Sequence, residues 1–283
     1  MRIMRLGAGP IIVPDMDRRM GSNINGPSLI RVPDWVPGPL GRYYLYFADH
    51  NGSYISLAVT DRIEGRWRTH EPGVLDLGES GGFIDHIASP EIFIDEGQQE
   101  IRLYFHGPVS RGDDGEFIQK TRVALSRDGL AFEVRPDLLG PSYFRVFERD
   151  GAFFALARSG ELLRSGDGLA PFESAGVPVG LPDGIRHVGL WRRSAERMKV
   201  FYTVIGDAPE SIWSADLVLA GDWRGWKAQS PRMHLQPEHA YEGADQPVMP
   251  SERGAINVPA NQLRDPDILV DADGAVYLAY VVQ

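Results

Sequence analysis

The sequence predicts an all-β protein, and more specifically a five-bladed β-propeller that occupies residues 1–283 as a single domain. Three observations support this prediction. Short apolar runs of strand type occur along the whole chain, no segment shows sustained helical periodicity, and one four-part order of strands recurs five times. With 283 residues, 43% of them hydrophobic, the chain is long enough to bury a full core.

The expected strands are runs rich in β-branched and aromatic residues, bounded by Gly, Asp, Asn or Pro. They comprise residues 43–48, 54–60, 101–105, 122–126, 153–157, 199–204 and 276–280. The 32 Gly and 21 Pro residues are scattered along the chain, which is typical of many turns between short strands.

Each repeating unit has an opening strand near Pro, an aromatic strand, a strand of small residues that ends in an Asp turn, and a short outer strand. The opening strands are expected at residues 26–32, 89–95, 140–146, 188–194 and 265–271, and the outer strands at Trp67, Phe132, Phe172 and Trp226. The turns SRDGLAFE (126–133) and SGDGLAPFE (165–173) are nearly literal repeats. Five units of about 57 residues each favour a propeller. A β-sandwich would share the strand content but would not explain the recurring order.

The fifth unit stops after its aromatic strand. We expect the N-terminal segment PIIVPD, residues 10–15, to supply a missing outer strand, so that the two ends of the chain close the ring. Deletion of residues 1–15 should then collapse the stability of the fold.

Composition excludes several classes of partner. The formal net charge of −10 argues against a nucleic-acid partner, because such interfaces need clustered Lys and Arg. The absence of Cys excludes disulfides and thiolate metal sites. The chain has neither the apolar core of a signal peptide near its N-terminus nor an apolar run of membrane-span length, so we expect a cytoplasmic protein without a membrane partner.

Polar residues at the starts of the innermost strands of a propeller converge at one mouth of its channel. The stretches at this position are residues 23–25, 85–86, 143–145, 186–187 and 264–265, and the turns after the aromatic strands add residues 49–50 and His106. The long loop of residues 238–263 is expected to form a lid or wall that carries Glu242, Asp245 and Arg253.

Four of the 7 histidines, namely His50, His86, His106 and His187, fall at strand ends that face the expected mouth. A neutral imidazole can donate and accept hydrogen bonds with sugar hydroxyls, and it can also ligate a metal. No compact spacing such as HExxH is present, so no cofactor is expected, while a metal ion in the central channel stays an open alternative. Each histidine taken alone could also be an ordinary hydrogen-bonded loop residue.

The unit openings, together with YYLYFADHNGSYISLAVTDRIEGRW (43–67), resemble the five-bladed propeller glycoside hydrolases of family 43 and its relatives over nearly the whole chain. HIASPEI (86–92) stands where that family has a Trp-Ala-Pro-Asp step in its second blade, and LRDPDILVDADGAVYLAY (263–280) resembles its last blade. The resemblance implies an oligosaccharide or glycoside substrate at the central pocket.

The same resemblance implies a base Asp in the first blade, a second Asp in the third, and an acid Glu at the opening of the fourth. Gly26, Gly140 and residues 186–189 stand at these positions, and none of them supplies the expected carboxylate. Asp265 alone keeps an Asp-Pro step. The usual catalytic set therefore cannot be carried over to this chain.

Most glycosidases need one carboxyl group that donates a proton and a second that acts as base or nucleophile. Asp49 and Asp85 are the relocated pair that we expect, with His86 and His187 as proton carriers. The residues expected to bind substrate are Asn25, His50, His106, Tyr143, Arg145, Trp191, Glu242, Arg264 and Asp265. Structural roles remain as alternatives: Asp85 could cap a strand, Asp265 could bind Arg264 or backbone amides, and Trp191 could belong to the core. Glu91 and Asp267 are expected to form hydrogen bonds between blades.

Three functions follow from these features. The first is a carbohydrate-active enzyme, a glycoside hydrolase with a non-standard catalytic set. The second is a sugar-binding protein without catalysis, and the third is a propeller that serves as a platform for protein interactions. The polar mouth, rich in His and Asp, favours the enzyme, whereas a platform should expose a large apolar patch that the sequence does not indicate.

Overall fold

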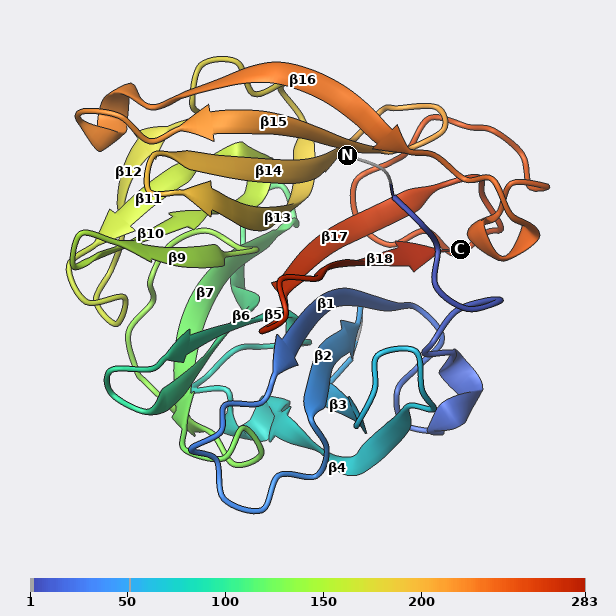
Figure 1. Ribbon diagram of the computed structural model, residues 1–283, viewed down its shortest axis with the longest axis horizontal. Coiled ribbons are helices and arrows are strands. Elements are labelled where there is room, and N and C mark those ends of the chain that lie inside the picture. Colours follow the sequence, from blue (N-terminus) through green and yellow to red (C-terminus); the bar gives the residue numbers. More distant parts are fainter. Residues whose placement is uncertain (1–2, 51, 283) are drawn as a thin grey trace.

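Four antiparallel sheets of four strands each and one sheet of two strands surround a central axis in the computed structural model (Figure 1). The structure describes residues 3–50 and 52–282. Consecutive strands are neighbours in every sheet, and Figure 1 shows the first strand of each sheet near the middle of the molecule. The chain therefore has the all-β propeller fold that the sequence predicts.

The four-stranded sheets are the blades, numbered in chain order. Blade one contains β1 (Ile24–Arg31), β2 (Tyr43–Asp49), β3 (Tyr54–Thr60) and β4 (Arg68–Asp76), and blade two contains β5 (Ala88–Asp95), β6 (Glu100–Arg111), β7 (Phe117–Ser126) and β8 (Glu133–Val134). Blade three contains β9 (Arg145–Arg149), β10 (Ala152–Leu156), β11 (Leu162–Ser165) and β12 (Glu173–Gly176), and blade four contains β13 (Ile185–Ser194), β14 (Arg197–Val204), β15 (Ile212–Val218) and β16 (Lys227–Leu235). The two-stranded sheet contains β17 (Leu263–Val270) and β18 (Val276–Val282).

The predicted count of five blades is wrong, because the described chain forms four blades of four strands. Within the described residues, β17 and β18 pair only with each other, and β17 contacts the inner strands β13 and β1 on its two sides. A two-stranded sheet thus fills the sector between blades four and one, where the sequence analysis expected a complete blade.

Residues 10–15 do not form the strand that was expected to close the ring. Pro14–Met16 form the 3-10 turn η1, and no strand pairs with this segment in the described part of the chain. The N-terminal segment instead packs through side chains, since Ile12 belongs to the same apolar cluster as Leu269 and Tyr277. Figure 1 shows this segment passing close to β18. Pro10 and Pro14 lack the amide hydrogen that a ladder requires, which explains why the segment joins no sheet.

The two near-identical Asp turns have the same structure and the same role. Asp128 accepts hydrogen bonds from the amides of Leu130 and Ala131, and Asp167 accepts the equivalent pair two and three residues further on. A tyrosine of the preceding blade then donates to the Gly carbonyl of each turn: Tyr46 to Gly129 at 2.8 Å and Tyr104 to Gly168 at 3.0 Å. The repeat therefore encodes a hydrogen bond between successive blades.

The outer strands begin one residue after the aromatic residues that the sequence placed at their starts. These residues are Trp67, Phe132, Phe172 and Trp226, followed by β4, β8, β12 and β16. All four aromatic side chains belong to, or pack against, apolar clusters of the core. Their burial anchors each outer strand to its blade.

Four of the five inner strands, all but β9, carry bulges at their starts, and these bulges position the site. The register shifts between Asn25 and Ser28, between Ala88 and Glu91, between Ile185 and Val188, and between Arg264 and Asp267. Gly26, Ser89, Tyr143 and Asp265 have positive φ angles of 59°, 46°, 63° and 50°. Gly26 is required, because a Cβ atom there would lie 2.7 Å from Cα of Ser89. A bulge re-aims the side chain it carries.

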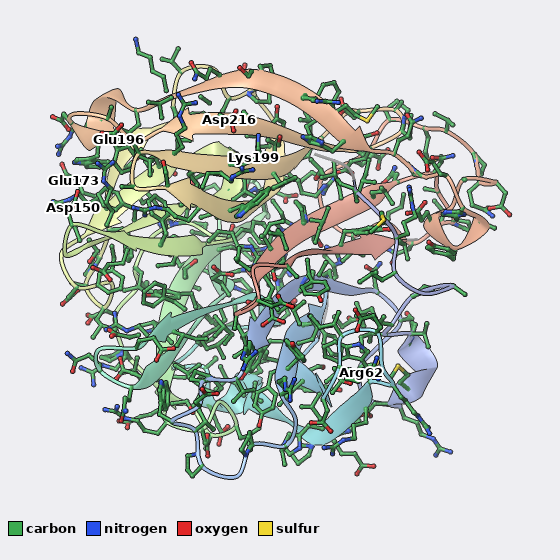
Figure 2. The ribbon with its side chains drawn as sticks, viewed as in Figure 1. Arg62, Asp150, Glu173, Glu196, Lys199 and Asp216 are labelled. Carbon is green, nitrogen blue, oxygen red and sulfur yellow. The ribbon has the colours of Figure 1, made fainter. Side chains whose placement is uncertain are left out.

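The periphery of the propeller carries ordinary charged side chains. Figure 2 shows Asp150, Glu173 and Glu196 at the outer edge of the molecule. Lys199 and Asp216 lie opposite each other on β14 and β15, with Nζ 2.7 Å from Oδ1. The helices that the structure describes are 3-10 turns of three residues: η1, η2 (Leu77–Glu79), η3 (Arg158–Gly160), η4 (Trp223–Gly225) and η5 (Ala240–Glu242). Among the described residues, none is long enough to cross a membrane.

Candidate active site at the channel mouth

The carboxylate of Asp265 meets the imidazole of His187 where β17 adjoins β13. Nδ1 of His187 donates a hydrogen bond to Oδ1 of Asp265, and the backbone amide of Gly26 donates to Oδ2 at 3.2 Å. Asp265 is 1% exposed and His187 is 7% exposed. The pair joins β1, β13 and β17, and we call the surrounding starts of the inner strands the channel mouth. Because an ionised carboxylate only accepts hydrogen bonds, this contact holds the proton of a neutral His187 on Nδ1.

Nε2 of His187 is buried and has no hydrogen-bond partner among the described residues. Burial, together with the positive charges of Arg186 and Arg145, holds the pKa of His187 well below its usual value. The ring is therefore neutral at pH 7 with a lone pair on Nε2. An imidazole held in this way by a carboxylate can accept a proton from a reacting group.

The ring of Tyr143 stands between two imidazoles. Its centroid lies 4.1 Å from that of His187 and 4.2 Å from that of His106, and both contacts are edge-on. Burial holds the pKa of His106 well below its usual value and raises the pKa of Tyr143. Nδ1 of His106 is a second buried nitrogen without a partner in the described part of the chain. Three rings from blades two, three and four thus meet at the mouth.

Blade one contributes His50 and Asn25. Nδ1 of His50 lies 2.5 Å from Nδ2 of Asn25 and 2.8 Å from Oδ1 of Asn23, so the proton on this nitrogen selects which amide it binds. Burial and the charge of Arg264 lower the pKa of His50 to about 4, although the neighbouring Asp49 opposes the shift. Asp49 itself accepts a hydrogen bond from the amide of Asn23 at 2.9 Å. It therefore orders the loop before β1 as well as facing His50.

A second Asp–His pair lies at the rim. Oδ2 of Asp85 is 2.9 Å from Nδ1 of His86, and the two side chains are 46% and 9% exposed. The positive φ of 73° at Asp85 and the edge-on packing of His86 against Phe117 fix the pair in this position. The mouth therefore carries one buried Asp–His pair and one that is accessible to solvent.

Glu210, which is fully buried, links two arginines of neighbouring inner strands. Nε of Arg186 donates to Oε1 at 2.8 Å, and Nε of Arg264 lies 3.0 Å from Oε2. Arg264 also binds Oε1 of Gln262 through Nη2 at 2.5 Å. Burial lowers the pKa of Arg264 to about 10, while Glu210 opposes this shift.

Residues 252–256 of the long loop cross the mouth. The carbonyl of Gly254 accepts hydrogen bonds from Arg264 at 3.2 Å and from Arg186 at 3.4 Å, and the carbonyl of Glu252 also accepts one from Arg186. At its other end, the carbonyl of Ile256 accepts a hydrogen bond from Asn23 at 2.6 Å. The loop thus runs from blade four to blade one, as expected for a wall of the site.

Arg145 was expected to bind substrate, but its guanidinium is occupied inside the channel. Nη1 donates to Glu91 at 2.5 Å, Nη2 to the carbonyl of Pro27 at 2.8 Å, and Nε to the carbonyl of Val188 at 2.9 Å. These partners belong to three other inner strands. Arg145 is therefore a structural link between blades. Glu91 forms the expected contact between blades, and so does Asp267, whose Oδ1 lies 3.8 Å from Nη1 of Arg145.

Two further expected substrate ligands lie in the scaffold. Glu242 is fully buried and accepts hydrogen bonds from Arg5 at 2.7 Å and from Tyr280 at 2.6 Å, which ties the N-terminal segment to β18. Trp191 packs in the apolar cluster between blade four and the two-stranded sheet, with Arg193 4.0 Å above its ring. Both placements follow from packing that is not visible in the sequence.

One backbone feature recurs at the starts of blades one, two and three and of the two-stranded sheet. Tyr143, not Gly140, has the positive φ shared by Gly26, Ser89 and Asp265 at the starts of inner strands. At the first-blade position, a carboxylate side chain on residue 26 would collide with Ser89. The close approach of these two bulges therefore excludes a base at residue 26.

Sequence reasoning missed Arg158 and Glu210. They lie in the turns after the aromatic strands β10 and β14, as His50 lies in the turn after β2. The rule that drew attention to the turns of units one and two would have found them if it had been extended to units three and four.

No group of three or more His, Cys, Asp or Glu side chains is placed to hold a metal ion within residues 3–50 and 52–282. The imidazoles of the mouth bind amides and a carboxylate and contact an aromatic ring. A metal in the channel therefore has no ready set of ligands in the described residues.

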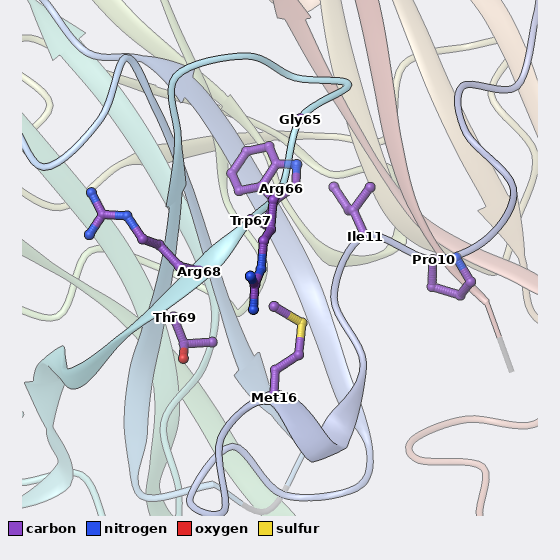
Figure 3. Close-up of a pocket in the computed structure, with 8 residues that line it drawn as sticks. All are labelled: Pro10, Ile11, Met16, Gly65, Arg66, Trp67, Arg68 and Thr69. Atoms are coloured by element: carbon purple, nitrogen blue, oxygen red, sulfur yellow. The ribbon is translucent and has the colours of Figure 1, made fainter.

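Two cavities lie away from the mouth. One of about 550 Å³ lies between the N-terminal segment and the start of β4, where Pro10, Ile11 and Met16 face residues 65–69 (Figure 3). The other, of about 220 Å³, lies beside β12 and η4. Neither cavity is lined by a residue of the predicted site, so the larger of the two does not lie at the candidate active site.

Comparison with known proteins yields one related sequence and several related folds. No protein-family model matches the chain. In an alignment 291 residues long, the chain is 35% identical to "Uncharacterized protein R118" of Acanthamoeba polyphaga mimivirus. The match covers 92% of this chain and 80% of the other.

Among solved structures, an N-acetylgalactosamine deacetylase from F. plautii, in complex with blood group B trisaccharide, is similar with a TM-score of 0.62 and 11% identity, covering 93% of this chain and 81% of the other. An endo-1,4-beta-xylanase from Bacteroides thetaiotaomicron gives 0.60 and 12%, covering 91% and 84%. An alpha-L-arabinofuranosidase from Lactobacillus brevis gives 0.57 and 11%, covering 90% and 82%. At these identities the similarity is one of fold.

Proposed function

We propose that this chain, which belongs to the same protein family as protein R118 of Acanthamoeba polyphaga mimivirus, is a carbohydrate-active enzyme that cleaves a glycosidic bond at the channel mouth. The observation that carries the proposal is the buried Asp265–His187 pair with its unpartnered Nε2. The similarity in fold to a xylanase and an arabinofuranosidase supports a sugar as the substrate. Function itself has to rest on the site, because one fold serves many activities.

Hydrolysis of a glycosidic bond requires a proton for the leaving oxygen and a group that activates water. In this proposal Nε2 of His187 accepts the proton of the attacking water, and Asp265 stabilises the imidazolium that forms. The rim pair, Asp85 and His86, supplies the proton for the leaving oxygen. Asp49 is a third carboxylate of the mouth and assists proton transfer at the blade-one side.

The proposed substrate contacts come from the rings and amides of the mouth. His50 and Asn25 offer nitrogen and oxygen atoms to sugar hydroxyls, and Arg264 contributes donors from β17. His106 and Tyr143 offer ring faces and polar tips on the opposite side. These residues surround the Asp265–His187 pair, which is why we place the sugar there.

Turnover of a panel of nitrophenyl glycosides and of plant and algal oligosaccharides tests the proposal. Asp85→Asn should reduce turnover, because the neutral amide cannot stabilise the positive charge of a His86 ring that carries the proton to the leaving oxygen. Asp150→Asn is a matched control, since Asp150 is also an exposed Asp with positive φ, 52°, and lies at the outer edge. Absence of turnover across the panel, or an equal effect of both substitutions, would contradict a hydrolase.

A second candidate is a sugar-binding propeller without catalysis. The wedging of Tyr143 between His106 and His187 favours it, because these rings occupy the centre of the mouth. Binding of a sugar without its cleavage, unaffected by Asp85→Asn, would select this second function.

A further inference from the structure

We propose that the sugar bound at the mouth carries a negative charge, and that Arg158 and Arg253 hold that charge. This inference rests on the proposed function, since it names the substrate class of the same site. It assigns to these two arginines a role in specificity.

Arg158 lies beside the ring of Tyr143. It is the first residue of η3, two residues after the end of β10, and its backbone amide donates to the carbonyl of Ser142 at 3.0 Å. Its positive charge acts on both rings: it adds to the burial that lowers the pKa of His106, and it opposes the burial that raises the pKa of Tyr143. Arg158 therefore lies close enough to the mouth for its charge to act on the ring of His106, whose Nδ1 has no partner in the described residues.

The side chain of Arg158 makes neither an ion pair nor a hydrogen bond within residues 3–50 and 52–282, although the residue is half-buried. Burial, and the like charges of Arg253 and Arg186, lower its pKa. Withdrawing a cation from water beside other cations costs free energy unless an anion compensates. A charged ligand would supply that compensation.

Arg253 brings a second cation to the same place. The carbonyls on either side of it, those of Glu252 and Gly254, both bind Arg186, so the backbone of Arg253 lies against that guanidinium. Its own side chain is exposed and has no ion pair in the described part of the chain. It can therefore turn toward a ligand without breaking a contact of the fold.

The charges at this side of the mouth do not balance. Arg158, Arg186, Arg253 and Arg264 lie near two buried carboxylates: Glu210, which is shared by two of them, and Asp265, which binds the neutral His187. Other buried arginines have their own partners, as Arg102 has Asp95 and Glu100. The chain as a whole has a formal net charge of −10, so this uncompensated positive cluster is opposite in sign to the net charge of the chain. A positive field confined to a site raises the local concentration of anions.

A planar guanidinium binds carboxylate, sulfate and phosphate through paired N–H donors. The shared chemistry is an oxyanion on the sugar, as in a uronic acid, a sulfated sugar or a sugar phosphate. The neutral rings of His187, His106 and Tyr143 then face the rest of the sugar.

Calorimetric titration of the full chain tests this assignment. The probes are trigalacturonate with its methyl ester as the neutral match, and glucose 6-sulfate and glucose 6-phosphate with glucose as their neutral match. We expect one anionic probe to bind at least about tenfold more tightly than its neutral match, and this preference to fall at high ionic strength. The probe that binds identifies the source of the oxyanion.

Arg158→Gln and Arg253→Gln should each remove most of that preference and leave the melting temperature unchanged. Arg197→Gln, which removes an exposed cation at the opposite end of β14, is the control and should leave binding as in the wild type. Equal binding of charged and neutral probes, or preference that survives both substitutions, overturns the inference while the proposed function stands. Failure of every sugar to bind overturns the proposed function and the inference with it.

Discussion

Nη1 of Arg145 on β9 lies 2.5 Å from Oε2 of Glu91 on β5, inside the channel and two residues beyond Tyr143. Burial raises the pKa of Glu91 to about 7, although Arg145 opposes the shift, and it also raises the pKa of Asp267. One guanidinium thus compensates two buried carboxyl groups directly behind the candidate site. The contacts that hold the inner strands together around the axis are therefore ionic as well as apolar. Their contribution to the stability of the fold can be tested apart from catalysis.

Arg145→Met should lower the free energy of unfolding by about 3–5 kcal/mol, because it leaves Glu91 and Asp267 buried without their cation. Urea unfolding of the purified chain measures the loss. Arg197→Met, at an exposed position, should change the stability by no more than about 0.5 kcal/mol. The double substitution Arg145→Met with Glu91→Leu should recover part of the loss; if it adds to the loss, the pairing is not the cause.

The stability that Glu91 confers should depend on pH. Its pKa is about 7 in the folded chain, above the ordinary value of 4.5, so the folded state holds this proton over a range where the unfolded state releases it. This contribution is complete below pH 4.5 and is lost as the pH rises to about 7, a change of about 3 kcal/mol.

Glu91→Gln removes this titration, so the stability of the wild type minus that of the variant should fall between pH 4.5 and pH 7. The difference is needed because His50, His106 and His187, whose pKa values are lowered, contribute in the opposite direction. Their contribution is present above pH 6.5 and is lost as the pH falls. A flat difference across this range would contradict the protonated state of Glu91.

Gly26→Ala should be much more harmful than Gly151→Ala. Both glycines have positive φ, 59° and 72°, but a Cβ atom on residue 26 would lie 2.7 Å from Cα of Ser89, whereas nothing lies within 4 Å at residue 151. Backbone strain alone costs about 1 kcal/mol at either position, and the collision should add about 2 kcal/mol at residue 26. Thermal unfolding compares the two; equal losses would show that the bulges of β1 and β5 separate freely.

The strand order could be predicted from the sequence because the residues that define each unit lie close together in the chain. The Tyr, Asp and Gly positions of one repeat, such as Tyr46 and Gly129, recur with their hydrogen bonds in the next. Closure of the ring depends instead on which distant segment covers the last sheet. PIIVPD has the apolar composition of a strand, but its prolines prevent pairing and Ile12 packs against the last sheet through its side chain. The last sheet therefore keeps two strands, and the structure has four blades of four strands.

The site could be predicted only where its partners are close in sequence. The Asp85–His86 contact is visible as a dipeptide, whereas His187 and Asp265 are 78 residues apart and meet only when β17 packs beside β13. The sequence alternative for Asp265 was a bond to Arg264 or to backbone amides. The amide of Gly26 does bind it, whereas Arg264 turns to Glu210 and Gln262. Arg145, Trp191 and Glu242 are residue types that can bind a sugar, which is why the sequence suggested them as ligands. Their burial in the fold gives them structural roles instead.

The kcat of the Asp265→Asn variant tests the central claim most directly, because the amide keeps the shape of the carboxylate but no longer fixes the proton of His187 or stabilises its charged form. With the sugar identified by the panel, we predict that kcat falls by about 100-fold to 10,000-fold while KM and the melting temperature stay close to the wild type, and that His187→Gln gives a similar loss. A kcat within about threefold of the wild type in both folded variants would contradict a catalytic His187–Asp265 pair.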